Sequence, residues 1–367
     1  MKKIMLVFGT RPEAIKMCPL VNELKKRPQF ETVVCVTGQH KEMLEQVLDI
    51  FKVKPDYNLN IMKDKQTLFD VTIGVLNGMK KVLEVESPDL VLVHGDTTTT
   101  FAAMLACFYM NVKVGHVEAG LRTYNIYSPY PEEFNRQAVS IVSEFNFAPT
   151  EIAKKHLLNE GKDEKSIFVT GNTGIDALAT TVSDNYFHDE LKWAEGSRLV
   201  LLTAHRRENL GEPMRHIFRA IKRVVDENPD IKVIYPIHKN PVVRGLANEI
   251  FGNDDKIHII EPLNPFDFHN FMNKAYLIMT DSGGVQEEAP SLGKPVLVLR
   301  DTTERPEGVA AGTLKLVGTN EDDIYREFSK LLVDKDEYMK MSKAANPYGD
   351  GFASKKIADI LQASLVD

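Results

Sequence analysis

Residues 3–14 read KIMLVFGTRPEA, and this stretch carries the pattern that decides the fold. An apolar run at residues 4–8 ends at Gly9, which is typical of a buried strand. Gly9 permits a tight turn, and Pro12 suits the first position of a helix. The stretch therefore predicts a strand, a tight turn and the start of a helix.

The same order of elements recurs through the first half of the chain. Short β-rich apolar runs alternate with longer stretches that carry apolar residues at helical spacing. We expect strands at residues 3–8, 32–37, 90–94, 113–117 and 145–149, and helices at residues 13–26, 41–50, 66–84 and 97–110. Repeated strand–helix units of this kind predict a parallel sheet.

The pattern restarts after a polar stretch at residues 183–197. We expect further strands at residues 198–203, 232–236, 257–260, 276–280 and 295–299. At 367 residues the chain exceeds the roughly 250–300 residues at which a single core stops growing. The sequence therefore predicts an α/β protein with two Rossmann-like, doubly wound parallel-sheet domains facing a central cleft. The first domain spans residues 1–170 and is completed by a C-terminal helix at 354–367, and the second spans residues 171–353.

Composition is that of a soluble globular protein. Hydrophobic residues make up 43% and charged residues 26%, and no apolar stretch approaches the roughly 20 residues that span a bilayer. The net charge of −7 argues against general attraction to nucleic acid. Cys18, Cys35 and Cys107 lie in apolar elements without metal-type spacing. They predict buried thiols without a disulfide, in a cytoplasmic enzyme.

Ligands of open α/β sheets gather at the carboxyl ends of the strands, so the loops that follow the strands are the informative ones. These loops lack the Gly-rich dinucleotide fingerprint and the Walker phosphate loop. No zinc-type cluster appears either. The sequence thus favours neither NAD, nor ATP hydrolysis, nor a metal.

Two cations and an aspartate follow strands of the first half. Arg11 and Lys16 stand at a helix start, where acidic residues are the usual choice, so they favour an anion pocket over solvated surface charges. Asp96 follows the strand at 90–94, where it either caps the next helix or takes part in a reaction.

Further acids follow in the same half. Glu118 ends the strand at 113–117, and the stiff loop SPYP at 128–131 leads into Glu132 and Glu133. These two glutamates either belong to an acid–base set or decorate the first turn of a helix. Three acidic loops at one sheet edge favour the acid–base interpretation.

A histidine and two arginines follow the strand at 198–203. His205, Arg206 and Arg207 form a combination that suits proton transfer and anion binding. The alternative is that the arginines are surface residues paired with Glu208. A buried strand leading directly into such a cluster favours a functional site.

Residues 280–289, TDSGGVQEEA, give the most specific phosphate signal. Small residues free the backbone amides at a helix N-terminus, where the dipole favours a pyrophosphate. Glu288, one turn along, suits a ribose diol, and Arg305 adds a cation. The residues alone predict a two-domain enzyme for a nucleotide-linked anion. Its acid–base set comprises Asp96, Glu118, Glu132 and His205.

Several motifs together carry a family resemblance. They are GTRPEAIKM at 9–17, VLVHGDTTTT at 91–100, GHVEAGLRT at 115–123, HRREN at 205–209 and TDSGGVQEEAPSLGKPVLVLRDTTERPE at 280–307. In this order, and over essentially the whole chain, they resemble the bacterial non-hydrolysing UDP-N-acetylglucosamine 2-epimerases. That resemblance implies the two-domain fold of B-type glycosyltransferases, the GT-B fold.

The resemblance also implies an activity. Such enzymes interconvert UDP-N-acetylglucosamine and UDP-N-acetylmannosamine without NAD or metal, by eliminating UDP to give an enzyme-bound 2-acetamidoglucal and adding it back on the other face. The implied catalytic groups are Asp96, Glu118, Glu132 and His205. The implied contacts with the UDP-sugar are Arg11, Lys16, Phe268, Ser282, Gly283, Gly284, Glu288 and Arg305, with Phe268 at uracil and Glu288 at ribose.

Some bacterial members of the family bind a second UDP-N-acetylglucosamine as an allosteric activator. The matching positions here are Gln39, His40, Arg206 and His238. Two neighbours depart from the pattern: Glu42 and Lys65 stand where close relatives with that site carry Gln and Arg, and lysine lacks the bidentate phosphate grip of arginine. Family precedent further implies a homodimer that supplies N-acetylmannosamine for cell-surface polysaccharides.

Three alternatives share the same motifs. A retaining UDP-sugar glycosyltransferase of the same fold would need a sugar acceptor and would leave C2 of the sugar untouched. A hydrolysing relative would release free N-acetylmannosamine. A UDP-sugar sensor without catalysis would have no need for a strand-end histidine and three acids.

Overall fold

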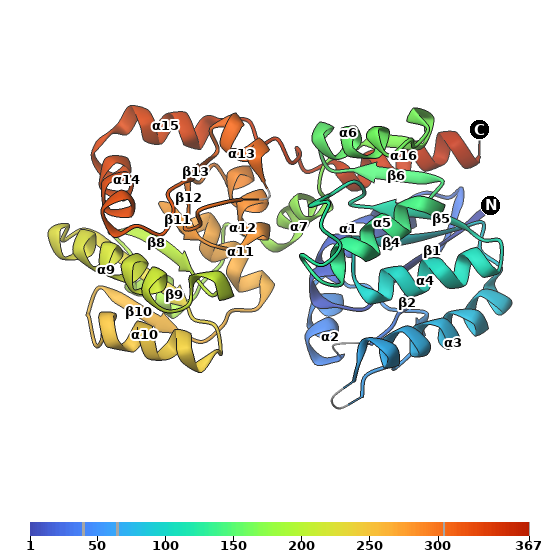
Figure 1. Ribbon diagram of the computed structural model, residues 1–367, viewed down its shortest axis with the longest axis horizontal. Coiled ribbons are helices and arrows are strands. Elements are labelled where there is room, and N and C mark those ends of the chain that lie inside the picture. Colours follow the sequence, from blue (N-terminus) through green and yellow to red (C-terminus); the bar gives the residue numbers. More distant parts are fainter. Residues whose placement is uncertain (39–40, 64–65, 304, 367) are drawn as a thin grey trace. The chain divides into compact units, whose positions relative to one another are not determined.

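The computed structural model describes residues 1–38, 41–63, 66–303 and 305–366, and side chains are not described for residues 41–43. The chain divides into two compact units (Figure 1). Unit 1 comprises Met1–Thr180 and Tyr348–Asp367, and unit 2 comprises Thr181–Pro347. Each unit is an α/β domain built on a parallel sheet, which confirms the predicted fold class.

Within the described residues, unit 1 has a seven-stranded parallel sheet with the order β3-β2-β1-β4-β5-β6-β7. Its strands are β1 (Lys2–Phe8), β2 (Phe30–Val36), β3 (Tyr57–Asn58), β4 (Leu90–His94), β5 (Lys113–Val117), β6 (Phe145–Ala148) and β7 (Ile167–Val169). The strand order reverses between β1 and β4. In open α/β sheets such a reversal leaves a crevice at the carboxyl ends of the strands.

Helices cover both faces of this sheet (Figure 1). They are α1 (Arg11–Lys25), α2 (Lys41–Ile50), α3 (Leu68–Glu86), α4 (Thr98–Tyr109), α5 (Glu132–Val142), α6 (Glu151–Asn159), α7 (Thr173–Thr181) and α16 (Ala353–Leu365), with a short 3-10 helix at Glu164–Ser166. Ile4, Leu6 and Phe8 of β1 pack into a core with α1 and α16, and Met5 and Val7 pack into another with α3 and α4. Both faces of β1 are buried, so the strand reads as a continuous apolar run.

Among the residues described for unit 2, six strands form a parallel sheet with the order β10-β9-β8-β11-β12-β13. The strands are β8 (Arg198–Thr203), β9 (Ile231–Pro236), β10 (Ile257–Ile260), β11 (Leu277–Thr280), β12 (Val296–Val298) and β13 (Leu314–Leu316). The order reverses between β8 and β11. Unit 2 therefore repeats the topology around the first strand of unit 1.

Helices again connect the strands of unit 2. They are α8 (Asp189–Trp193), α9 (Glu212–Glu227), α10 (Pro241–Phe251), α11 (Pro265–Lys274), α12 (Gly283–Glu288), α13 (Pro306–Ala311), α14 (Glu321–Val333) and α15 (Lys335–Lys343), with 3-10 helices at Arg207–Asn209 and Ala289–Leu292. Val200 and Leu202 of β8 pack against Phe218 of α9 and Phe328 of α14. This apolar contact fixes the position of β8, and hence of the loop that follows it.

Three short strands, β3, β7 and β13, are absent from the prediction. Each has only two or three residues and lies at an edge of its sheet. An apolar pattern of that length does not stand out in a sequence, because alternation needs about four residues to be recognised. Pairing with a longer neighbour is what makes these segments strands.

The observed division between the units lies after Thr180 and before Tyr348 rather than at the expected positions 170 and 353. Tertiary contacts of α7 explain the difference. Asp176 accepts hydrogen bonds from the backbone amides of Ala353 (3.1 Å) and Ser354 (2.6 Å), and Ala177 packs into the core of unit 1. Helix α7 and the start of α16 therefore belong together.

Three further findings concern the described residues only. No helix among them is long and apolar enough to cross a membrane. No group of three or more His, Cys, Asp or Glu side chains among them is placed to hold a metal ion. Cys18, Cys35 and Cys107 are buried free thiols.

Candidate functional site

The carboxyl edge of the sheet in unit 1 brings several charged side chains together. Asp96 follows β4, Glu118 follows β5, and Arg11 begins α1 directly after the turn that ends β1. Glu118 has a φ of 65°, in the left-handed region, which costs a non-glycine residue about 1–3 kcal/mol. Strain of this kind persists where the surrounding structure holds it in place, and it is concentrated at functional sites.

Glu118 forms the centre of a partly buried polar cluster. Its carboxylate pairs with the Lys16 ammonium, and Oε2 lies 3.5 Å from Nε2 of the buried His94. Burial opposes ionisation of Glu118, but Lys16 and His94 overcome this and hold the pKa of the carboxyl well below its usual range. Glu118 is therefore an anion, and the expected cation Lys16 is engaged with it.

Asp96 is held from three sides. Its Oδ2 accepts a hydrogen bond from Arg136 at 2.6 Å, and its backbone carbonyl accepts one from the Asn135 amide at 2.9 Å. His116 donates from Nε2 to the carbonyl of Gly95 at 2.7 Å, and burial lowers the pKa of His116 to about 3. The turn that carries Asp96 is thus held by hydrogen bonds from Arg136, Asn135 and His116.

The Asp96 side chain is not the cap of the next helix. Thr97 is the N-cap residue of α4, and its hydroxyl accepts from the Thr100 amide at 3.1 Å. Burial raises the pKa of Asp96, while the Arg136 charge acts against this rise and the neighbouring Glu118 and Glu132 add to it. A partly buried carboxyl with a raised pKa is suited to proton transfer.

The two glutamates that begin α5 have different surroundings. Glu133 is fully buried and accepts from the amides of Thr123 and Tyr124, both at 3.0 Å, and from Gln137 at 2.7 Å. It therefore anchors the preceding loop. Among the described residues, Glu132 Oε2 is buried without a hydrogen-bond partner. Of the two, Glu132 is the one available for chemistry.

Arg11 is a partly buried cation at the first turn of α1. None of the described carboxylates pairs with its guanidinium, and burial lowers its pKa. Glu13, two residues on, is instead occupied in holding the turn: it accepts from the amides of Gly9 (3.0 Å) and Thr10 (2.8 Å) and from the Thr97 hydroxyl (2.7 Å). A cation without a carboxylate partner at a rigid helix start favours an anionic ligand.

In unit 2, the phosphate-type loop follows β11. Ser282 is the N-cap residue of α12, and Gly283 and Gly284 begin that helix. A Cβ atom on Gly283 would come within 2.5 Å of Arg305 Nη1, so only glycine lets this guanidinium lie against the backbone. Arg305 is fixed there by its hydrogen bond from Nε to Glu287 at 2.6 Å.

Glu288 ends α12 and faces α11. Its carboxylate lies 3.6 Å from Nε2 of the buried His269, whose Nδ1 is 2.7 Å from the Thr181 hydroxyl. Phe268, next to His269 on α11, is half-buried. His269 thereby connects Glu288 with Thr181 and follows Phe268 directly in α11, contacts that no sequence motif indicated.

His205 lies at the carboxyl end of β8. Its Nδ1 is 3.4 Å from Asp281 Oδ1, and its ring stacks on His238 with centroids 5.4 Å apart and an interplanar angle of 13°. Burial lowers the pKa of His205. Glu208 accepts a hydrogen bond from Nε of Arg300 at 2.9 Å. The sequence had suggested Arg206 or Arg207 as its partner instead.

The expected site residues therefore fall into one group in each unit. Unit 1 gathers Arg11, Lys16, Asp96, Glu118 and Glu132. Unit 2 gathers Arg206, His205 and His238 after β8 and β9, and Phe268, Ser282, Gly283, Gly284, Glu288 and Arg305 around α11 and α12. Gln39, His40 and Lys65, and the side chain of Glu42, lie outside the described residues.

The anchoring residues were missed by sequence reasoning. Asn135, Arg136, His269 and Glu287 each act by holding other side chains or a turn. Their only sequence signal is proximity to a motif, because what they contact is far away along the chain. Arg136 and Asp96, for example, are separated by 40 positions.

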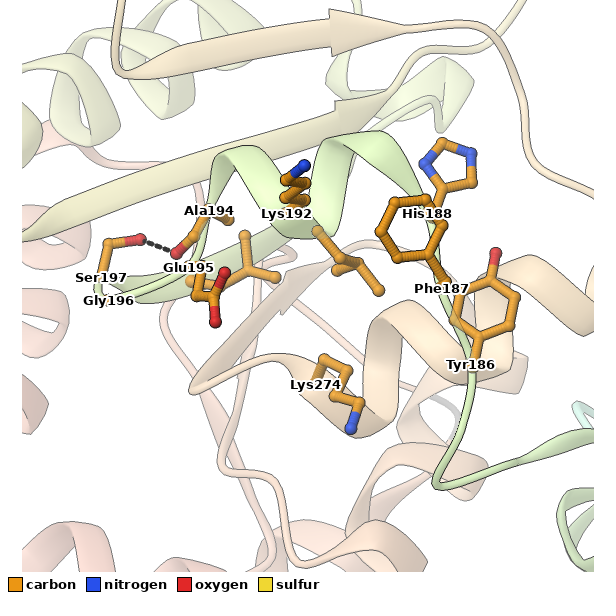
Figure 2. A pocket seen from close by; sticks show the side chains of 11 residues that line it. Tyr186, Phe187, His188, Lys192, Ala194, Glu195, Gly196, Ser197 and Lys274 are labelled. Carbon is orange, nitrogen blue, oxygen red and sulfur yellow. Dashed lines mark hydrogen bonds between the residues drawn. The ribbon is translucent and has the colours of Figure 1, made fainter.

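A pocket of about 440 Å³ lies away from these groups (Figure 2). Its lining comes from ten residues between Tyr186 and Leu199, on and around α8, and from Lys274 at the end of α11. It adjoins the amino end of β8, whereas His205 follows the carboxyl end of that strand. The pocket therefore lies at the opposite edge of the sheet from the candidate site.

Comparisons with known proteins agree over the whole length of the chain. The sequence profile of the UDP-N-acetylglucosamine 2-epimerases matches residues 22–362. A UDP-N-acetylglucosamine 2-epimerase of Bacillus subtilis is 61% identical over 359 residues, which cover 98% of this chain and 94% of that protein.

Two solved structures with bound ligands are also similar to this chain. The S. aureus MnaA–UDP co-structure has a TM-score of 0.91 at 53% identity and covers 100% of this chain and 97% of that one. UDP-GlcNAc 2-epimerase from Neisseria meningitidis bound to UDP-GlcNAc has a TM-score of 0.89 at 49% identity, with coverage of 99% and 100%.

Proposed function

Because the chain belongs to the UDP-N-acetylglucosamine 2-epimerase family, we propose that it interconverts UDP-N-acetylglucosamine and UDP-N-acetylmannosamine by inverting C2 of the sugar. The observation that carries this proposal is the set of three carboxyl groups at one sheet edge of unit 1. Asp96 and Glu118 are each held by a cation, and Glu132 Oε2 is buried without a hydrogen-bond partner among the described residues. Inversion at carbon needs proton acceptors and donors of this kind on both faces.

The proposed reaction proceeds by elimination and re-addition. A carboxylate removes the proton at C2 while the C1–oxygen bond breaks, UDP leaves with the electron pair, and 2-acetamidoglucal remains bound. Re-addition of UDP at C1 with protonation of C2 on the opposite face gives the epimer. No net oxidation or hydrolysis occurs, so the scheme balances without NAD and without a metal.

Departure of UDP places charge on the pyrophosphate, and fixed donors reduce the barrier. We assign this role to the amides at Ser282–Gly284 and to the cations Arg11 and Arg305. Each well-placed donor contributes about 3 kcal/mol to such a transition state. Glu288 would accept hydrogen bonds from the ribose hydroxyls, and Phe268 would pack on uracil. We thus assign the grip on the nucleotide to these groups of unit 2, and a part in proton transfer to His205.

Isotope exchange tests the proposal directly. Incubation with UDP-N-acetylglucosamine in heavy water, without added NAD, is expected to place deuterium at C2 and to accumulate the manno epimer. Product analysis by NMR separates the alternatives. A retaining glycosyltransferase would leave C2 unlabelled, a hydrolysing relative would release free N-acetylmannosamine, and a sensor would give neither product nor label.

We also propose a homodimer that forms through unit 1. Helices α3, α4 and α5 lie side by side (Figure 1), and they expose large apolar side chains that a monomer would leave in water. These side chains are Phe69, Ile73, Phe108, Tyr109 and Ile141. Exposed apolar side chains on three neighbouring helices suit a self-association surface.

Two features of the family remain proposals for this chain. Arg206 and His238, expected at an activator site, lie close to His205, so a second UDP-N-acetylglucosamine bound there would adjoin a proposed catalytic group. The three buried thiols fit a reducing compartment, so we place the enzyme in the cytoplasm, supplying N-acetylmannosamine for cell-surface polysaccharides.

A further inference from the structure

We propose that Asp281 is a positioning residue that fixes both the place and the tautomer of His205. The inference rests on the proposed function of His205 in proton transfer. Asp281 belongs to the TDSGG stretch, where sequence reasoning assigned roles only to Ser282, Gly283 and Gly284. Its side chain points to the neighbouring strand end rather than into the phosphate loop.

One oxygen of Asp281 holds the backbone that carries His205. The side chain is fully buried, and Oδ2 accepts from the amides of His205 and Arg206, both at 2.8 Å. The Asn209 amide group adds a third contact to Oδ2 at 3.3 Å. Charge-assisted bonds to two successive amides fix the turn after β8.

The other oxygen faces the imidazole. Asp281 Oδ1 is buried and has no hydrogen-bond partner among the described residues, yet it lies 3.4 Å from Nδ1 of His205. A buried carboxylate oxygen without a donor is costly, and a proton on Nδ1 relieves that cost after a small movement of the ring. With the proton held on Nδ1, Nε2 is the nitrogen left free to exchange a proton with substrate.

The other charged groups around His205 act in the opposite direction. Burial of the imidazole lowers its pKa, and the nearby His238 and Arg206 lower it further, whereas Asp281 raises it. Asp281 is thus the group that favours a proton on the ring. Loss of its charge should move the pKa of His205 downward and release the ring from one tautomer.

Asp281→Asn separates this role from simple support of the backbone. The asparagine carbonyl can still accept from the two amides, but its NH₂ group then faces Nδ1 and favours the wrong tautomer. We expect kcat to fall by at least about 100-fold, the scale of general acid–base catalysis, while KM changes less than about threefold. The limb of the pH–rate profile that depends on His205 should move to lower pH.

Asp254→Asn is the matched control. Asp254 is also a mostly buried carboxylate that accepts from a backbone amide, that of Lys256 at 2.8 Å, but it precedes the amino end of β10. This variant should keep full activity. His205→Asn combined with Asp281→Asn should be little slower than His205→Asn alone, because the two residues act as one unit.

A readout that does not depend on catalysis completes the test. Nitrogen NMR of histidine-labelled protein should show Nδ1 of His205 protonated in the wild type and the tautomer altered in Asp281→Asn. An unchanged tautomer would overturn the proposal, as would loss of UDP binding in parallel with kcat, which would indicate structural support alone. If the wild type fails to epimerise while the NMR result holds, the proposed function fails and the pairing of Asp281 with His205 stands.

Discussion

Arg136 donates a hydrogen bond from Nη2 to Asp96 Oδ2 at 2.6 Å, and its Nη1 lies 3.3 Å from the fully buried Glu133. Both Arg136 and Glu133 belong to the first turns of α5, the helix that begins with Glu132. The same helix therefore presents Glu132, holds Asp96 through Arg136 and holds the loop at 123–124 through Glu133. The turn that carries Asp96 and the loop at residues 123–124 therefore both depend on this one helix for their positions.

Removal of the Arg136 charge is expected to slow the reaction. In Arg136→Ala the pKa of Asp96, already raised by burial, rises further because Glu118 and Glu132 remain beside it. Activity that needs ionised Asp96 should fall about 100-fold at neutral pH, and the acid limb of the pH–rate profile should move to higher pH. Arg136→Lys should recover part of the rate. Arg244, which is partly exposed and paired with Glu261, offers a control, since its replacement by Ala should leave kcat unchanged. An unshifted acid limb would contradict a link between Arg136 and Asp96.

Asp96→Asn should abolish turnover and yet stabilise the fold at neutral pH. The folded-state pKa of Asp96 is raised, so its ionisation disfavours folding once the pH exceeds the unfolded value of 3.8. The neutral asparagine removes this penalty. The gain in free energy of unfolding, measured by urea denaturation, should be present at pH 7 and vanish as the pH falls below the unfolded pKa. A loss of stability at pH 7 would show that the bond to Arg136 outweighs burial.

Gly283→Ala should weaken UDP binding with little effect on folding. The added methyl group would displace the Arg305 guanidinium, which can swing away because it ends a flexible side chain. We expect the Kd for UDP, measured by calorimetry, to rise at least about tenfold, or roughly 1.4 kcal/mol. Gly245→Ala in α10 is the paired control, because the space around Gly245 is open; it should stabilise the protein by about 0.5–1 kcal/mol and leave UDP binding unchanged. Equal UDP affinity in both variants would argue against a nucleotide contact of Arg305.

The proposed dimer can be tested at two of its exposed apolar positions. Ile73→Glu and Ile141→Glu place a charge on α3 and α5, where 57% and 75% of the native side chains are exposed. Each should convert the dimer to a monomer in sedimentation experiments. Val333→Glu, at the end of α14 in unit 2, changes a residue that is 79% exposed and should leave the dimer intact. If the dimer persists in both unit 1 variants, the interface lies elsewhere on the protein.

Much of the fold can be predicted from sequence because it rests on local patterns. The strands at residues 90–94, 113–117, 198–203 and 257–260 have the predicted bounds, since each is a short, mostly apolar run between polar turns. The candidate site could be predicted in outline for the same reason: functional groups of a parallel sheet follow its strands. The shortest strands were missed because pairing, rather than pattern, creates them.

The sequence by itself determined the α/β class, the parallel sheets, the loops that carry the acids, histidine and glycines, and, through the ordered motifs, the family. Tertiary structure decided which of those side chains are anchors and which remain available. Glu132 and Glu133 are adjacent and chemically identical. Glu133 is fully buried and accepts hydrogen bonds from two backbone amides, whereas Oε2 of Glu132 is buried without a hydrogen-bond partner in the part of the chain that the structure describes. Hydrogen-bond partners and burial depend on segments distant in the chain, so only the folded structure could separate Glu132 from Glu133, or connect Asp281 with His205.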